Sequence, residues 1–162
     1  MSNALTSIFF DVLVTAGCDL ATTPWERALV YWLVQHDQSR LGLGIVGFDV
    51  EEMGWTHESF ESERRFVTTL VDSALRRHGW DRLPFSPAEE HLFPALEQFR
   101  KLVLALPSNV ASSVSNQTWV PGELPDRGLC DVHRVYLHET GCIICNDVPL
   151  DAPSAAAPNR SL

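Results

Sequence analysis

Basic residues and catalytic motifs are both scarce in this sequence. Its 162 residues include 12 Lys and Arg against 21 Asp and Glu, which leaves a formal net charge of -9. A surface this acidic is repelled by phosphate backbones and by anionic lipid, so neither nucleic acid nor a membrane is an expected partner. A basic protein is the more natural partner. The chain also lacks the G-x-S-x-G motif and a paired Cys-His signature, which argues against a hydrolase of the common nucleophilic classes.

An export or membrane-spanning segment is not predicted either. The N-terminal run MSNALTSIFFDVLVTAG has no positive charge ahead of its apolar residues and carries Asp11 within it. We therefore expect a cytoplasmic protein. Hydrophobic residues make up 45% of the chain and charged residues 20%, as in globular proteins. This composition predicts a single globular domain over residues 1–150, followed by a disordered tail at 151–162 that is small, polar and proline-containing.

Three helices are predicted from their start and stop signals. The first begins at Thr23, whose hydroxyl is placed to cap the helix, with Pro24 at the first helical position and Glu26 completing a capping box. The second covers residues 57–78 and ends before Gly79, where a left-handed cap belongs. The third opens with a similar box at Ser86 and runs to residue 106, with Pro94 inside it predicting a kink or two abutting helices.

Short strands are predicted around these helices. The aromatic and β-branched run at 8–14 favours a buried strand, although Gly17 leaves a short helix open as an alternative. Further short strands are predicted at 110–114 and 118–120, and the glycine-containing segment 41–50 is expected to be a strand or loop rather than a phosphate-binding loop. The predicted fold class is accordingly α+β: a mostly helical core of three main helices with a small β region and a zinc-stapled C-terminal hairpin.

The clearest chemistry lies in the stretch CDVHRVYLHETGCIIC. Cys130 and His133 form a C-x2-H pair, and Cys142 and Cys145 form a C-x2-C pair eight residues later. A two-residue gap lets one tight turn direct two side chains at the same ion, and two such turns make a tetrahedral Cys3His site for zinc. His138 is an alternative fourth ligand, with less favourable spacing. Four protein ligands predict a structural rather than a catalytic ion.

This stretch, residues 130–145, resembles the short zinc-ribbon and zinc-knuckle modules, whose ligands commonly come as C-x2-C or C-x2-H pairs. The resemblance implies a structural Zn2+ and covers only this part of the chain. Its ligand spacing is shorter than that of most zinc ribbons. Two alternatives stay open: a zinc-free hairpin with free thiols, and a redox-active C-x-x-C, although no helical pattern follows Cys145 as it does in thioredoxin-like units.

Acidic residues are concentrated between positions 49 and 63. They form either a solvated face or a partner-binding face, and the candidate partner-binding residues are Asp49, Glu51, Glu52, Glu58, Glu61 and Glu63. Our leading hypothesis is a non-enzymatic acidic protein-binding module with a structural zinc site, of which a bacterial immunity or antitoxin-like inhibitor of a basic toxin is one concrete form. The alternatives are a zinc-ribbon adaptor in transcription or RNA metabolism, which needs a basic face, and an uncharacterised metal-dependent enzyme with its site in the acidic segment.

Overall fold

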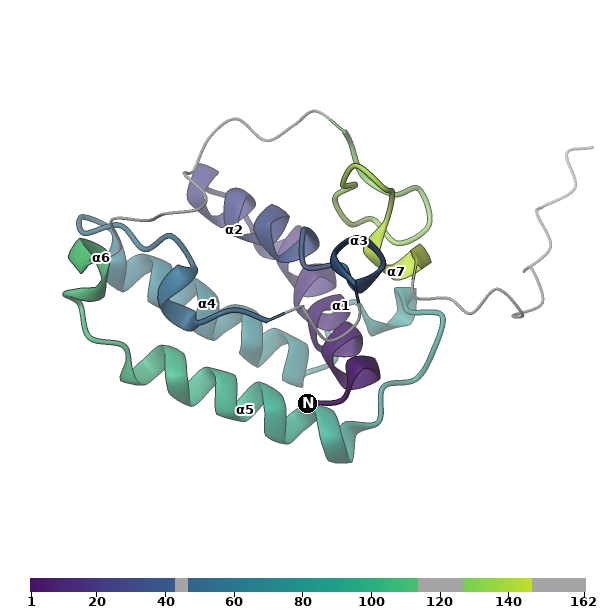
Figure 1. Cartoon of the computed structure of the whole chain (residues 1–162), viewed down its shortest axis with the longest axis horizontal. Helices are drawn as coiled ribbons and strands as arrows, with labels where there is room; N and C mark the ends of the chain where they lie inside the picture. The colour runs from purple at the N-terminus through teal and green to yellow at the C-terminus, as the bar shows by residue number, and fades with distance from the viewer. Residues whose placement is uncertain (43–46, 114–126, 147–162) are drawn as a thin grey trace, which may run out of the picture.

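The computed structural model of the chain describes residues 1–42, 47–113 and 127–146, and the described residues form helices joined by short connections (Figure 1). The helices are α1 (Asn3–Leu20), α2 (Pro24–Val34), α3 (Gln38–Leu41), α4 (Phe60–Leu75), α5 (Glu89–Ala105), α6 (Val110–Ser113) and α7 (Ile143–Asn146), with 3₁₀ turns η1 (Val50–Glu52) and η2 (Trp80–Arg82).

The prediction of an α+β fold is wrong for the described residues, which contain no β-strand. Extended pairing is limited to two isolated antiparallel bridges, Leu129 with Tyr136 and His138 with Gly141. Residues 127–146, which we call the cysteine segment, therefore form tight turns rather than a hairpin of strands. The segment expected as a strand at 110 forms the single turn α6, and residues 114 and 118–120 lie outside the described part of the chain, as does the predicted tail at 151–162.

The predicted strand at 8–14 lies in the middle of α1. Every residue from Phe9 to Gly17 is buried, because α2, α4 and α5 all pack against this helix. A helix covered on all sides shows no polar face in its sequence, so its apolar run cannot be distinguished from a buried strand by periodicity. By length and composition α1 is also the one described helix that could cross a membrane, but half of it is buried among the other helices.

The predicted helix starts and stops are partly confirmed. The capping box of Thr23 and Glu26 forms at the start of α2, with each side chain bound to the other residue's backbone N–H. The helix predicted over 57–78 is shorter, since α4 ends at Leu75 with Arg76 as its cap. Gly79 is left-handed, with φ of +75°, but it precedes the 3₁₀ turn η2 instead of capping α4. The box predicted at Ser86 does not form, since α5 begins at Glu89 after Ala88, which provides no side-chain cap. Pro94 lies within α5, which runs as one helix rather than two.

The helices α1, α2, α4 and α5 enclose one hydrophobic core. In Figure 1, α4 and α5 lie side by side. The close approach of α1 to α2 depends on Gly17, because a Cβ placed there would lie 2.6 Å from a methyl carbon of Val30. The cysteine segment joins the same core through Val135, Ile143 and Ile144, all essentially inaccessible to solvent. This packing fixes the position of the cysteine segment on the helical body.

Candidate metal centre

The first ligand pair lies on a tight turn at 130–134. The N–H of Cys130 donates to the carbonyl of Val135 at 2.8 Å, and the N–H of Arg134 donates to the carbonyl of Cys130 at 2.9 Å. Arg134 closes the turn in the left-handed region, with φ of 56°. The N–H of His133 points at the sulfur of Cys130, 3.5 Å away. The turn therefore places the side chains of Cys130 and His133 on the same side.

The second ligand pair begins after a turn that Gly141 makes possible. His138 and Gly141 exchange backbone hydrogen bonds of 2.9 and 3.1 Å, and Gly141 has φ of +116°, a conformation that side chains disfavour. The single helical turn α7 follows directly. Because residues three apart share a helix face, Cys142 and Cys145 direct their thiols to the same point.

The two pairs meet as a compact cluster. The ligand atoms of Cys130, His133, Cys142 and Cys145 all lie within 4.8 Å of one another. His133 Nδ1 is 3.7 Å from the Cys130 sulfur, 3.5 Å from that of Cys142 and 3.3 Å from that of Cys145. The sulfurs of Cys130 and Cys145 are 3.9 Å apart, far beyond the roughly 2.05 Å of a disulfide.

These separations match the edges of a tetrahedron around a metal ion. With Zn–S bonds of about 2.3 Å and Zn–N bonds of about 2.0–2.1 Å, a tetrahedral zinc ion separates its sulfurs by about 3.8 Å and sulfur from nitrogen by about 3.6 Å. Four of the six observed edges, at 3.9, 3.7, 3.5 and 3.3 Å, lie within a few tenths of an ångström of these values, and the two edges that join the Cys142 sulfur to the other sulfurs lie within 4.8 Å. The cluster is therefore compact enough to hold a metal ion.

Burial and neighbouring groups shift the pKa values of the four residues in different directions. Cys130, His133 and Cys142 are buried, and Cys145 is the exposed member. Burial raises the pKa of the Cys142 and Cys145 thiols, and the Cys130 sulfur raises both further. Burial, with Arg82 nearby, lowers the pKa of His133 and favours the neutral imidazole that binds metals. Burial also disfavours the Cys130 thiolate, but the N–H groups of His133 and Val132 outweigh it and lower that pKa.

His138, the alternative ligand, lies elsewhere and serves a different purpose. Its Nδ1 faces the N–H and the hydroxyl of Thr140 at 3.3 and 3.0 Å, and its Nε2 is 2.9 Å from a carboxylate oxygen of Asp37. The side chains of His138 and Asp37 are both fully buried. The same carboxylate oxygen accepts a hydrogen bond of 2.7 Å from the side chain of Asn146. Asp37, between α2 and α3, thus fastens the turn at 138–141 and the end of α7 to the helical body.

The anchoring role of Asp37 is not predicted from the sequence. Asp37 and Asn146 are 109 positions apart, and no local motif connects them. The only indication in the sequence is the position of His138 near the cysteines, which favours its interpretation as an alternative fourth ligand. Cys18, the fourth cysteine of the chain, stays outside the cluster. It is partly buried on α1, and burial raises the pKa of its thiol to about 12, so it is a poor nucleophile and a poor ligand at neutral pH.

The acidic candidates divide into two groups. Asp49, Glu51, Glu52, Glu58 and Glu61 are exposed, and Glu61 pairs with Arg64 at 2.7 Å. Glu63 is buried instead. Its carboxylate accepts hydrogen bonds from the N–H of Thr56 at 2.7 Å and from the Thr56 hydroxyl at 2.5 Å. Glu63 therefore fixes the segment ahead of α4 and has no free surface to offer a partner.

Comparison with known proteins identifies no relative for this chain: no family model, no curated protein and no solved structure matches it.

Proposed function

We propose that Cys130, His133, Cys142 and Cys145 hold a structural zinc ion that shapes the C-terminal segment. The observation that supports this most directly is the tetrahedral agreement of the sulfur and nitrogen separations. Three thiolates and one imidazole form a donor set that binds zinc in preference to the harder calcium and magnesium ions. Four protein ligands leave no open position for substrate or water, so the ion stabilises the fold rather than catalysing a reaction.

Metal content of the purified chain, measured by mass spectrometry, tests this proposal. We expect one zinc per wild-type chain prepared without chelator, and loss of zinc in a Cys142→Ser, Cys145→Ser double variant. Wild-type protein that contains no zinc, and takes none up from a zinc buffer, would contradict the proposal.

We further propose that the protein is a non-enzymatic module that binds a basic protein through its acidic surface. Two features support this: the net charge of -9, and the exposed positions of Asp49, Glu51, Glu52, Glu58 and Glu61. Opposite charges across an interface accelerate association and select the partner. An immunity or antitoxin-like inhibitor that masks a basic toxin is a specific form of this function.

The zinc-ribbon adaptor is the weaker alternative. It requires a free basic face, for which the candidate cations are Arg64, Arg65, Arg76, Arg77, Arg82, Arg100 and Lys101. Four of these seven pair with carboxylates: Arg64 with Glu61, Arg77 with Glu89, Arg82 with Asp19 and Arg100 with Asp72. Such pairs reduce the positive potential that a phosphate backbone would meet.

The protein-binding proposal is tested by capture from lysate of the source cells, at low and at high salt. We expect a basic protein retained at low salt and released as salt screens the attraction. Recovery of nucleic acid, with no protein retained, would favour the adaptor and overturn the proposal.

A further inference from the structure

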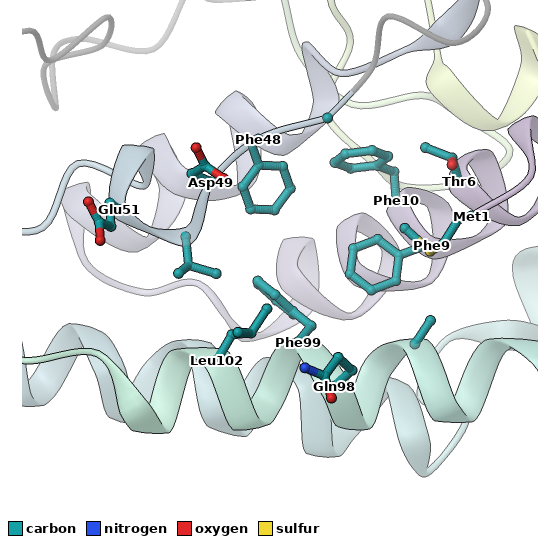
Figure 2. Close-up of a pocket in the computed structure, with 13 residues that line it drawn as sticks. Met1, Thr6, Phe9, Phe10, Phe48, Asp49, Glu51, Gln98, Phe99 and Leu102 are labelled. Atoms are coloured by element: carbon teal, nitrogen blue, oxygen red, sulfur yellow. The ribbon is translucent and has the colours of Figure 1, made fainter.

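An apolar groove lies between α1, α5 and the segment 47–51 (Figure 2). Its cavity volume is about 600 Å³. Thr6, Phe9 and Phe10 of α1 form one wall, and Ala95, Gln98, Phe99 and Leu102 of α5 form the other. None of these residues belongs to the metal centre.

Four phenylalanine rings, from both walls and from the segment 47–51, line this groove and contact one another. Phe9 and Phe99 meet edge to face with ring centroids 5.5 Å apart, and Phe48 lies 5.9 Å from both Phe10 and Phe99. Phe9, Phe10 and Phe99 are buried, so their rotamers are fixed by the core. At the mouth, Leu102 leaves 47% of its surface in water. A preformed apolar pocket beside an exposed leucine gains free energy when another apolar side chain enters it.

The charges around the groove indicate what can enter. Asp49 and Glu51 stand at one end, both exposed, and Figure 2 shows them on the same side of Phe48. Among the described residues that line the groove, no Lys, Arg or His side chain is present, and Met1, which carries the N-terminal ammonium group, lies at the opposite end from Asp49 and Glu51. A second copy of this chain would bring another charge of -9, and anionic lipid or nucleic acid would be repelled in the same way. The complementary occupant is apolar and basic.

We propose that this groove takes an apolar side chain from an amphipathic, basic segment of a partner protein, with Lys or Arg of that segment meeting Asp49 and Glu51. This rests on the proposed function as a protein-binding module and locates its binding site. The apolar anchor provides the affinity, and the acidic rim selects a basic sequence around the anchor.

Leu104 provides a matched control for the groove. It lies on α5 with 46% of its surface exposed, against 47% for Leu102, but it does not line the groove. Asp81 and Glu97 provide the control for charge, since both are exposed, neither lines the groove and neither belongs to the acidic candidates between 49 and 63. The test therefore compares Leu102→Ser with Leu104→Ser, and an Asp49→Asn, Glu51→Gln double variant with an Asp81→Asn, Glu97→Gln double variant of the same net charge.

The probe is a synthetic peptide of leucine and lysine at helical spacing, titrated into the zinc-loaded full chain by fluorescence anisotropy. Its controls are a scrambled isomer and a leucine–glutamate counterpart. We expect the amphipathic basic peptide to bind at least about tenfold more tightly than either control. We expect Leu102→Ser and the Asp49, Glu51 variant to remove most of that difference, and the two matched controls to change it by less than about twofold.

Two results overturn the proposal: no preference for the amphipathic basic peptide, or equal losses in the groove variants and their controls. These failures are distinguishable from failure of the protein-binding function. A basic protein captured from lysate equally well by wild type and by Leu102→Ser would preserve that function and place its site elsewhere.

Discussion

At the scale of single residues, substitution of Cys145 and of Cys18 distinguishes the loss of a metal ligand from the loss of a partly buried thiol. Both are free thiols, but only Cys145 lies in the cluster, 3.3 Å from His133 Nδ1. Cys145→Ser leaves three ligands, so we expect the zinc content to fall well below one per chain. Loss of a structural metal belongs to the strongly destabilising class of changes, and we expect the free energy of unfolding to fall by more than about 2 kcal/mol. Metal analysis and urea unfolding measure the two effects.

Cys18→Ser is the control for this change. Its zinc content should equal that of the wild type, because Cys18 lies on α1 and outside the cluster. Equal zinc loss in both variants would mean that either substitution removes zinc by disturbing the fold, and the assignment of the ligands would be wrong.

Glu63 gives a prediction about pH. Burial raises the pKa of its carboxyl above the ordinary value, although the bonds from Thr56 partly oppose this. Because the folded-state pKa is the higher one, the carboxyl contributes its full stability below the unfolded-state pKa, and that contribution is lost as pH rises through the folded-state pKa. Glutamine cannot ionise and still pairs with Thr56. We therefore expect Glu63→Gln to gain stability relative to the wild type as pH rises from 4.5 to 7, measured by urea unfolding at each pH. A difference between the two proteins that does not change with pH would refute this.

At the scale of the helices, the close contact of α1 with α2 leaves no room for a side chain at Gly17. Alanine is the better helix former, but its Cβ would lie 2.6 Å from one methyl carbon of Val30 and 3.2 Å from the other. The two helices would have to separate, and we expect Gly17→Ala to destabilise the protein by about 1–3 kcal/mol. Gly47→Ala is the control, because a Cβ there meets nothing within 4 Å. A thermal melt in which Gly17→Ala is as stable as Gly47→Ala would show that the helices tolerate a wider spacing.

The same helices show what the sequence can and cannot predict. The start of α2 is predictable because its capping box is local, and the meeting of the four Cys and His side chains is predictable because each pair is fixed by its own turn. The helical state of residues 8–14 is not, because burial on all sides removes the polar face that would distinguish helix from strand. The buried state of Glu63 and the pairing of Asp37 with Asn146 depend on tertiary packing, which local spacing does not encode.

At the scale of the whole molecule, the cysteine segment and the helical body are held in different ways. Helices α1, α2, α4 and α5 bury one another, whereas the short turns at 130–146 have few backbone hydrogen bonds of their own. Removing zinc with a strong chelator should therefore unfold the cysteine segment while most of the helix content remains. Far-UV circular dichroism would show a small loss, and limited proteolysis would show new cleavage within 127–146. Loss of all helical signal on chelation would mean that the metal supports the entire fold.

Asp37 tests whether docking of this segment is separable from metal binding. The proposed zinc ion would shape the segment internally, and the Asp37 carboxylate joins the segment to the helical body through His138 and Asn146. Asp37→Ala leaves two donors without their carboxylate in a buried site, which costs about 1–3 kcal/mol for each such group. Because the four ligands are untouched, we expect the variant to keep one zinc per chain yet to be cleaved within 127–146 like the chelated wild type. If Asp37→Ala loses its zinc as completely as Cys145→Ser does, then the helical body is itself needed to assemble the ligands, and docking and metal binding are a single event.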